Sequence, residues 1–174
     1  MRQGTYYFSL ALMTAGVTAT GSITVSISST GGPAPGSGPV ALRSGAPQNY
    51  ALGPVNRSTL FNGAGSYTIE VPQGATRLEI RLVTSTPGVD VDLFARFGQD
   101  TTLSGGDVVA DHSSTGPLAD ELIVVTPTSS PPLRAGTYYV SLALYTTGVT
   151  AAGALVATVT SGSQIGRASC RERV

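Results

Sequence analysis

The chain has 174 residues, a length that suits one domain with additional segments. Hydrophobic residues make up 41% of it, charged residues make up only 11%, and the formal net charge is zero with arginine as the sole basic residue type besides one histidine. This balance argues against a nucleic-acid partner, and no apolar run reaches the ~18 residues of a membrane span.

The first predicted elements lie in residues 1–28, which nearly repeat a segment close to the other end of the chain. Residues 4–29 and 136–161 align at a constant offset of 132 with 15 identities in 26 positions. Alternation of apolar and polar residues predicts two strands in each copy. Residues 1–28 are therefore predicted to be the closing strand pair, a β-hairpin, of a preceding repeat. The chain is then a fragment of a longer tandem protein. Because a lone hairpin is marginal in water, we expect it to drive self-association.

One domain is expected to follow a linker. Residues 29–38, STGGPAPGSG, have the composition of a flexible linker, and the domain occupies residues 39–163. Period-two alternation or strand-like composition predicts its strands at 67–71, 78–82, 91–97, 107–112, 121–126, 138–144 and 154–160. Short strands separated by Gly- and Pro-rich turns predict an all-β fold, an antiparallel β-sandwich.

The end of the chain differs in composition from everything before it. Residues 165–174, IGRASCRERV, contain the only cysteine, Cys170, and three of the ten arginines. They resemble a translated sequencing adaptor, and residues 164–174 are therefore predicted to be a non-native tail. For this reason Cys170 supports no catalytic, metal or redox hypothesis.

Three motifs in order resemble the bacterial pre-peptidase C-terminal (PPC) domain: YTIEVPQGATRLEIRL, GVDVDLFARFG and PPLRAGTYYVSLALYTTG. The Asp92-Leu93-Phe94 element and the Gly-Thr-Tyr-Tyr strand from residue 136 are the most specific parts. The resemblance covers about residues 39 to 161. It implies a jelly-roll-like sandwich attached to secreted peptidases and other exported proteins. The implied role is a non-catalytic accessory module; some relatives bind collagen or other polymers, and some are removed during maturation.

The expected function is therefore binding outside the cell, as part of a larger secreted or cell-surface protein. The expected partner is an extracellular protein or polymer, or neighbouring repeats of the same protein. Two alternatives remain open: a structural tandem repeat of a surface or adhesion protein, and a cleaved extension that assists export of a peptidase. No enzymatic activity is predicted, because His112 is the only histidine and no G-x-S-x-G motif presents a nucleophile beside it.

Acidic residues offer the one candidate metal site. Asp90 and Asp92 are two positions apart on a predicted strand, so both carboxylates leave the same face, and Asp111 follows later in the chain. Calcium takes six to eight oxygen ligands, several of them carboxylates. Calcium-binding relatives use acidic residues just before the first strand, whereas this sequence has no acid before Glu70. The two readings are a calcium site and a solvated acidic edge partly paired with Arg96; no other cofactor is expected.

Tyrosines on the strand from residue 138 are the candidate ligand contacts. Alternation predicts that Tyr138 packs in the core, while Tyr139 and Tyr145 share the opposite face. Tyrosine suits a binding surface because it covers a large area and keeps a polar tip. It is also simply a good strand residue, so packing remains the alternative for both.

Overall fold

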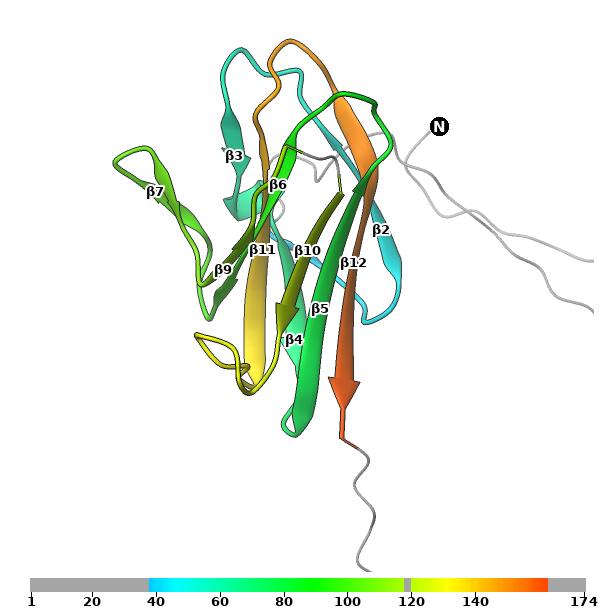
Figure 1. Cartoon of the computed structure of the whole chain (residues 1–174), viewed down its shortest axis with the longest axis vertical. Helices are drawn as coiled ribbons and strands as arrows, with labels where there is room; N and C mark the ends of the chain where they lie inside the picture. Colours follow the sequence, from blue (N-terminus) through cyan, green and yellow to red (C-terminus); the bar gives the residue numbers. More distant parts are fainter. Residues whose placement is uncertain (1–37, 118–119, 163–174) are drawn as a thin grey trace, which may run out of the picture.

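Strands dominate the part of the chain that the computed structural model describes, residues 38–117 and 120–162. Two sheets lie face to face, with a small extra hairpin at one side (Figure 1). No helix in these ranges is long and apolar enough to cross a membrane. The predicted hairpin of residues 1–28, nearly all of the predicted linker and the predicted tail with Cys170 lie outside the described residues.

The first sheet, sheet A, is built around a central strand that is buried on both faces. Paired strands in sheet A run antiparallel to each other, except that β1 runs parallel to β4. Its order is β1 (Val40–Ala41), β4 (Tyr67–Val71), β11 (Gly136–Leu144), β6 (Val91–Phe97) and β9 (His112–Ser114), and β3 (Thr59–Phe61) also pairs with β11. A short 3-10 turn, η1 (Gly63–Gly65), follows β3.

The second sheet, sheet B, is antiparallel throughout. Its order is β10 (Asp120–Val125), β5 (Ala75–Thr84), β12 (Ala151–Ser161) and β2 (Pro47–Leu52). The remaining strands, β7 (Thr102–Ser104) and β8 (Asp107–Val109), form the two-stranded hairpin that projects from the sandwich in Figure 1. The predicted all-β sandwich is confirmed.

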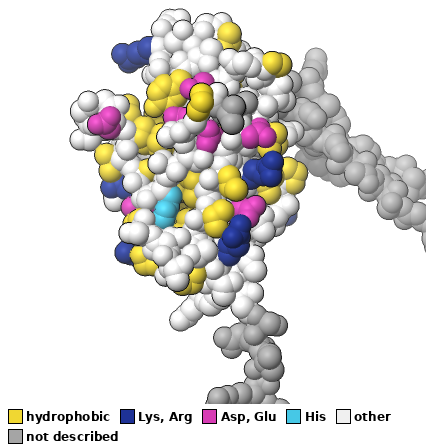
Figure 2. All heavy atoms as spheres, viewed as in Figure 1, with side chains coloured by type: hydrophobic (Ala, Val, Ile, Leu, Met, Phe, Trp, Pro, Cys, Tyr) yellow, Lys and Arg dark blue, Asp and Glu magenta, His cyan; other side chains and the backbone are white. Residues whose placement is uncertain are grey.

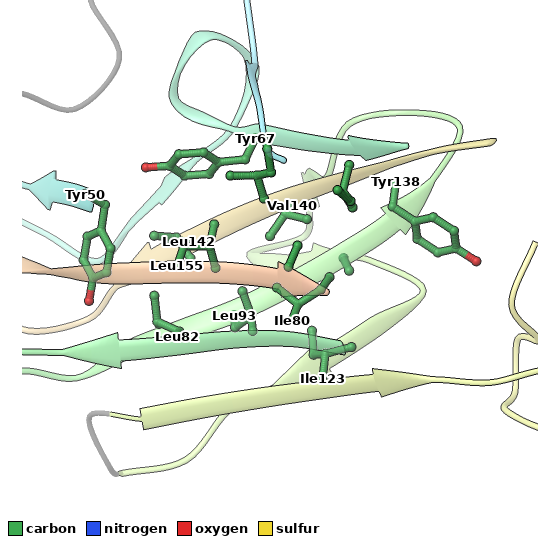
Figure 3. Close-up of a cluster of buried hydrophobic side chains, with 14 of the residues drawn as sticks. Tyr50, Tyr67, Ile80, Leu82, Leu93, Ile123, Tyr138, Val140, Leu142 and Leu155 are labelled. Carbon is green, nitrogen blue, oxygen red and sulfur yellow. The ribbon is translucent and has the colours of Figure 1, made fainter. Parts of the chain in front are cut away.

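Alternate residues of the two sheets meet in one apolar core, as the period of a strand requires. Side chains of sheet A and sheet B point toward one another in Figure 3, and fully buried ones among them include Leu93, Val140, Leu142, Ile80, Leu82 and Leu155. Tyr138 is 1% exposed and packs edge-to-face on Phe97 with 5.2 Å between ring centroids. Its hydroxyl accepts a 3.0 Å hydrogen bond from the Arg134 N–H, so the core position predicted for Tyr138 is confirmed.

The described copy of the repeated segment, residues 136–161, is not a hairpin. In the copy that the structure describes, β11 lies in sheet A and β12 in sheet B, and neither strand pairs with the other. Residues 145–150 carry the chain across the sandwich between them. The prediction of a closing pair is wrong for this copy, because alternation identifies the buried face of a strand but not the strand beside it.

The single strand predicted over residues 107–112 is also wrong. Residues 107–109 form β8 of the projecting hairpin, and His112 starts β9 on the edge of β6. Between them the Asp111 N–H donates a 3.0 Å hydrogen bond to the Ala95 carbonyl. The chain changes partner at this point, which divides one extended segment into two strands.

Gly153 of β12 lies where the buried ring of a tyrosine crosses the core-facing side of sheet B. Tyr50 and Thr84 are its neighbours on β2 and β5, and their hydroxyls are 2.7 Å apart. A Cβ atom at residue 153 would stand 2.0 Å from the Val83 carbonyl oxygen and 2.8 Å from the Tyr50 hydroxyl. Close approach of backbone and ring therefore requires glycine here.

We predict that Gly153→Ala lowers the free energy of unfolding by about 3 kcal/mol, since relief of the clash must displace backbone of β5. Urea unfolding followed by circular dichroism measures the change. Gly162→Ala is the matched control, because its Cβ would make ordinary contact at 3.4 Å with Thr76. Equal stability of the two variants would contradict the role assigned to Gly153.

Candidate functional site

The outer face of β6 carries side chains that are unusually well covered for the outside of a sandwich. Phe94 is 5% exposed and Asp92 is 6% exposed, although both point away from the core shared by the two sheets. They lie at the base of a pocket whose walls come from the β7–β8 turn, the segment after β9 and the segment after β11.

The pocket has a volume of about 560 Å³ and combines three carboxylates with two aromatic rings. In Figure 2, acidic side chains gather in the upper part of the face shown, among hydrophobic ones. No arginine of the described ranges lines the pocket. Its lining consists of Asp90, Asp92, Phe94, Gly106, Asp107, Val108, Thr115, Gly116, Pro117 and Tyr145.

Two backbone contacts place Tyr145 beside the acids. The Tyr145 N–H donates a 3.1 Å hydrogen bond to the Asp90 carbonyl, and the Asp90 N–H donates one of 2.9 Å to the Thr146 hydroxyl. Asp90 thus holds the start of the 145–150 connection against the start of β6. Its own Oδ1 atom is buried and has no hydrogen-bond partner among the described residues.

Asp92 is the carboxylate most affected by this environment. Burial raises the pKa of Asp92 to about 6, and the negative charges of Asp90 and Glu121 act in the same direction. The Gly116 N–H lowers the pKa only in part. At pH 7 Asp92 is therefore ionised, although its surroundings favour the protonated form. Such perturbed groups in a cleft are typical of functional sites.

Glu121 supports the pocket from sheet B. It is 5% exposed, and its carboxylate accepts hydrogen bonds from the Ser114 hydroxyl and, at 3.1 Å, from the Gly116 N–H. These contacts fix the segment after β9 that forms one wall. Glu121 is thus a positioning residue.

The structure brings together two of the three predicted calcium ligands. Asp90 and Asp92 both line the pocket, whereas the Asp111 carboxylate accepts a 2.8 Å hydrogen bond from the Phe97 N–H outside it. No cluster of three metal-binding side chains is found in residues 38–117 and 120–162. Arg96 donates to the Asp100 carbonyl at 3.1 Å and forms no ion pair in these ranges, so the expected pairing of Arg96 with the acidic edge is wrong.

The two candidate tyrosines do not form one strip. Tyr145 is 43% exposed at the pocket, while Tyr139 is half-buried between Thr68 and Arg96 and does not line it. Six positions separate Tyr139 from Tyr145, which corresponds to roughly 20 Å along an extended chain. Between them Ser141 is buried under the loop after β6, where it accepts a 2.6 Å hydrogen bond from the Thr101 hydroxyl.

His112 shows no arrangement for catalysis. It begins β9 opposite Ala95 and is half-buried. Burial lowers its pKa, and the charge of Asp111 opposes that change. Among the described side chains no hydroxyl is hydrogen bonded to the imidazole.

Phe94 and Asp107 also line the pocket, although neither is among the predicted site residues. Phe94 follows Asp92 by two positions, so the strand period signals that both leave the same face. Asp107 reaches the pocket through the turn between β7 and β8, and the Gly105-Gly106 pair in that turn is a local hairpin signal that could have identified the fold-back.

Comparison with known proteins gives similarity in structure alone. The chain is similar to the pre-peptidase C-terminal domain of a collagenase from Bacillus anthracis, with 13% identity, a TM-score of 0.41, and coverage of 71% of this chain and 93% of that one. It is also similar to TmCBM61, solved in complex with beta-1,4-galactotriose, with 16% identity, a TM-score of 0.34, and coverage of 66% and 69%. The sequence matches no protein-family profile and no curated protein. Membership of the PPC family therefore stays a prediction.

We predict that Asp92→Asn raises the free energy of unfolding at pH 7.5 by about 1–2 kcal/mol. One pKa unit corresponds to about 1.4 kcal/mol, and the opening of the pocket to water reduces the full effect. Because the folded-state pKa of about 6 lies above the usual 3.8, wild-type stability falls as the pH rises through about 6. The variant lacks this fall.

Urea unfolding between pH 4 and 8 measures both effects. Asp120→Asn is the control, because this carboxylate lies on β10 outside the pocket and is exposed, 4.0 Å from Arg81. A lower stability of Asp92→Asn than of wild type at pH 7.5 would show that Asp92 is stabilising and would refute the assignment.

Proposed function

We propose that this chain is a non-catalytic accessory module of a larger secreted or cell-surface protein, and that its pocket binds a side group of an extended protein or polysaccharide. The observation that carries the proposal is the exposed ring of Tyr145 at the mouth of an open pocket whose base holds Asp92 and Phe94. Aromatic surface with a few convergent polar groups is the usual composition of a ligand site.

The residues that line the pocket favour a binding site over a catalytic site. It contains no histidine, serine, cysteine or lysine that could act as a nucleophile or base. The chemical alternative is a pair of carboxylates, since a raised pKa such as that of Asp92 is also a property of a general acid. Assays for glycoside and peptide cleavage therefore belong to the test, and we expect no cleavage.

We predict that Tyr145→Ala weakens polymer binding about tenfold, the effect expected for a tyrosine at the centre of a binding site. Co-sedimentation with insoluble protein and polysaccharide polymers measures it. Tyr139→Ala is the matched control, because Tyr139 lies on β11, the strand that ends just before Tyr145, and does not line the pocket. If both variants bind as wild type does, or if product is released from any polymer, the proposed function fails.

The internal repeat favours a second candidate, a structural tandem repeat of a surface protein. Residues 4–29 match a segment whose two strands are inner strands of different sheets, β11 between β4 and β6 and β12 between β5 and β2. A segment of this type completes a sandwich only when both sheets of another repeat are at hand. In a longer chain the preceding repeat would provide them.

We predict that the full chain self-associates, whereas residues 39–163 alone are monomeric. Edge strands offer unpaired backbone groups to an added strand, and β2 and β10 are the edges of sheet B. Light scattering of both forms over a concentration series tests this. A monomeric full chain would contradict the association and weaken the tandem-repeat reading.

A further inference from the structure

The pocket beside Tyr145 holds negative charge without a counterion of its own. Asp90, Asp92 and Asp107 line it, and no basic side chain does. The described residues form two ion pairs, neither of which involves these carboxylates: Arg77–Glu79 and Arg81–Asp120. Carboxylates that share a partly buried site attract a positive charge.

A second feature of the pocket is a buried hydrogen-bond acceptor. Asp90 Oδ1 is buried without a donor in the described part of the chain, and an atom closed to solvent is out of reach of a ligand. The carboxylate that a ligand in the pocket would meet is that of Asp92, which lines it. Asp92 is 6% exposed, and the nearby Gly116 N–H already donates to Glu121. A buried acceptor without a donor is unfavourable. A ligand that brings both hydrogen-bond donors and positive charge would satisfy this site.

The aromatic residues define the shape of such a ligand. Phe94 and Tyr145 line the same pocket as the acids, and aromatic rings attract the flat face of an organic cation. A guanidinium group is planar, carries five donors and stacks on rings while it binds carboxylates. The volume of about 560 Å³ admits a long side chain.

We infer that this pocket binds the guanidinium or ammonium group of an arginine or lysine side chain on an extended protein partner. The inference rests on the proposed function and specifies the ligand of that same site. A calcium ion would need six to eight oxygens, and the described ranges contain no cluster of three metal-binding side chains. A neutral sugar would cover Tyr145 but would leave the negative charge uncompensated.

Calorimetric titration of the full chain with N-acetyl-arginine methylamide and with its citrulline analogue tests the charge directly. The two probes differ in charge but hardly in shape. We expect the arginine probe to bind about tenfold more tightly, because hydrogen bonds between charged groups are the stronger ones. The preference should fall in Asp92→Asn and Asp107→Asn and persist in Asp120→Asn, whose carboxylate lies outside the pocket.

The lysine analogue, calcium chloride and a neutral β-linked oligosaccharide are titrated in parallel. Equal affinity for the arginine and citrulline probes, or an unchanged preference in Asp92→Asn, overturns the inference. So does calcium that binds more tightly and displaces the arginine probe. If citrulline equals arginine while polymer binding still depends on Tyr145, the cation is refuted and the proposed function stands. If Tyr145→Ala leaves polymer binding intact, the proposed function itself is refuted.

A pH series supplies an independent readout. Asp92 is surrounded by Asp90, Asp107, Glu121 and Tyr145, and its pKa is raised to about 6 by burial and by the charges of Asp90 and Glu121. As the pH falls through about 6, Asp92 becomes neutral. The preference for arginine over citrulline should then decrease, whereas a constant ratio between pH 7.5 and 5 counts against a carboxylate-bound cation.

Discussion

The loop after β6 lies on the outer face of β11, where the buried hydroxyls of Thr101 and Ser141 are hydrogen bonded at 2.6 Å. Asn62 donates to the Thr101 carbonyl at 2.9 Å and ties the β3 side of sheet A to the same loop. Each of these polar groups has a partner, so burying them is tolerable. This third layer covers the middle of sheet A up to Phe94, which stands opposite Ser141 on β6. The uncovered remainder of that face, from Phe94 to Asp90, is where the pocket opens.

Six strands could be predicted from alternation or from strand-like composition: β4, β5, β6, β10, β11 and β12. The strands that were missed are short or interrupted, and β2 begins with a proline at a sheet edge. The pairing of the strands was harder to predict than the strands themselves. A strand's period fixes its face locally, whereas pairing depends on residues far apart in the chain. For this reason the repeat pattern predicts two strands in residues 136–161 but does not show that they belong to different sheets.

The same distinction explains what could be known of the site. Asp90 and Asp92 share a face by local geometry alone, and the structure places both at the pocket. Asp111 has the right chemistry in the sequence, but its carboxylate caps the Phe97 N–H instead. Tyr145 and Tyr139 have the same parity along the chain, yet β11 ends at Leu144 and the chain then turns to meet Asp90. Long-range contacts therefore decide which of the chemically suitable residues meet.

The pocket is a place where the fold is less stable than it could be. Burial and two neighbouring carboxylates oppose ionisation of Asp92, and Asp90 Oδ1 lacks a donor. Neutral side chains at these positions would avoid the cost of burying a charge and would make the folded state more stable. A positive ligand of the kind proposed would reverse the balance, because its charge would lower the pKa of Asp92. By linkage, a ligand that binds only the folded state adds stability in proportion to its occupancy. Ligand binding and the protonation of Asp92 thus oppose each other, which makes the acidic pocket responsive to both.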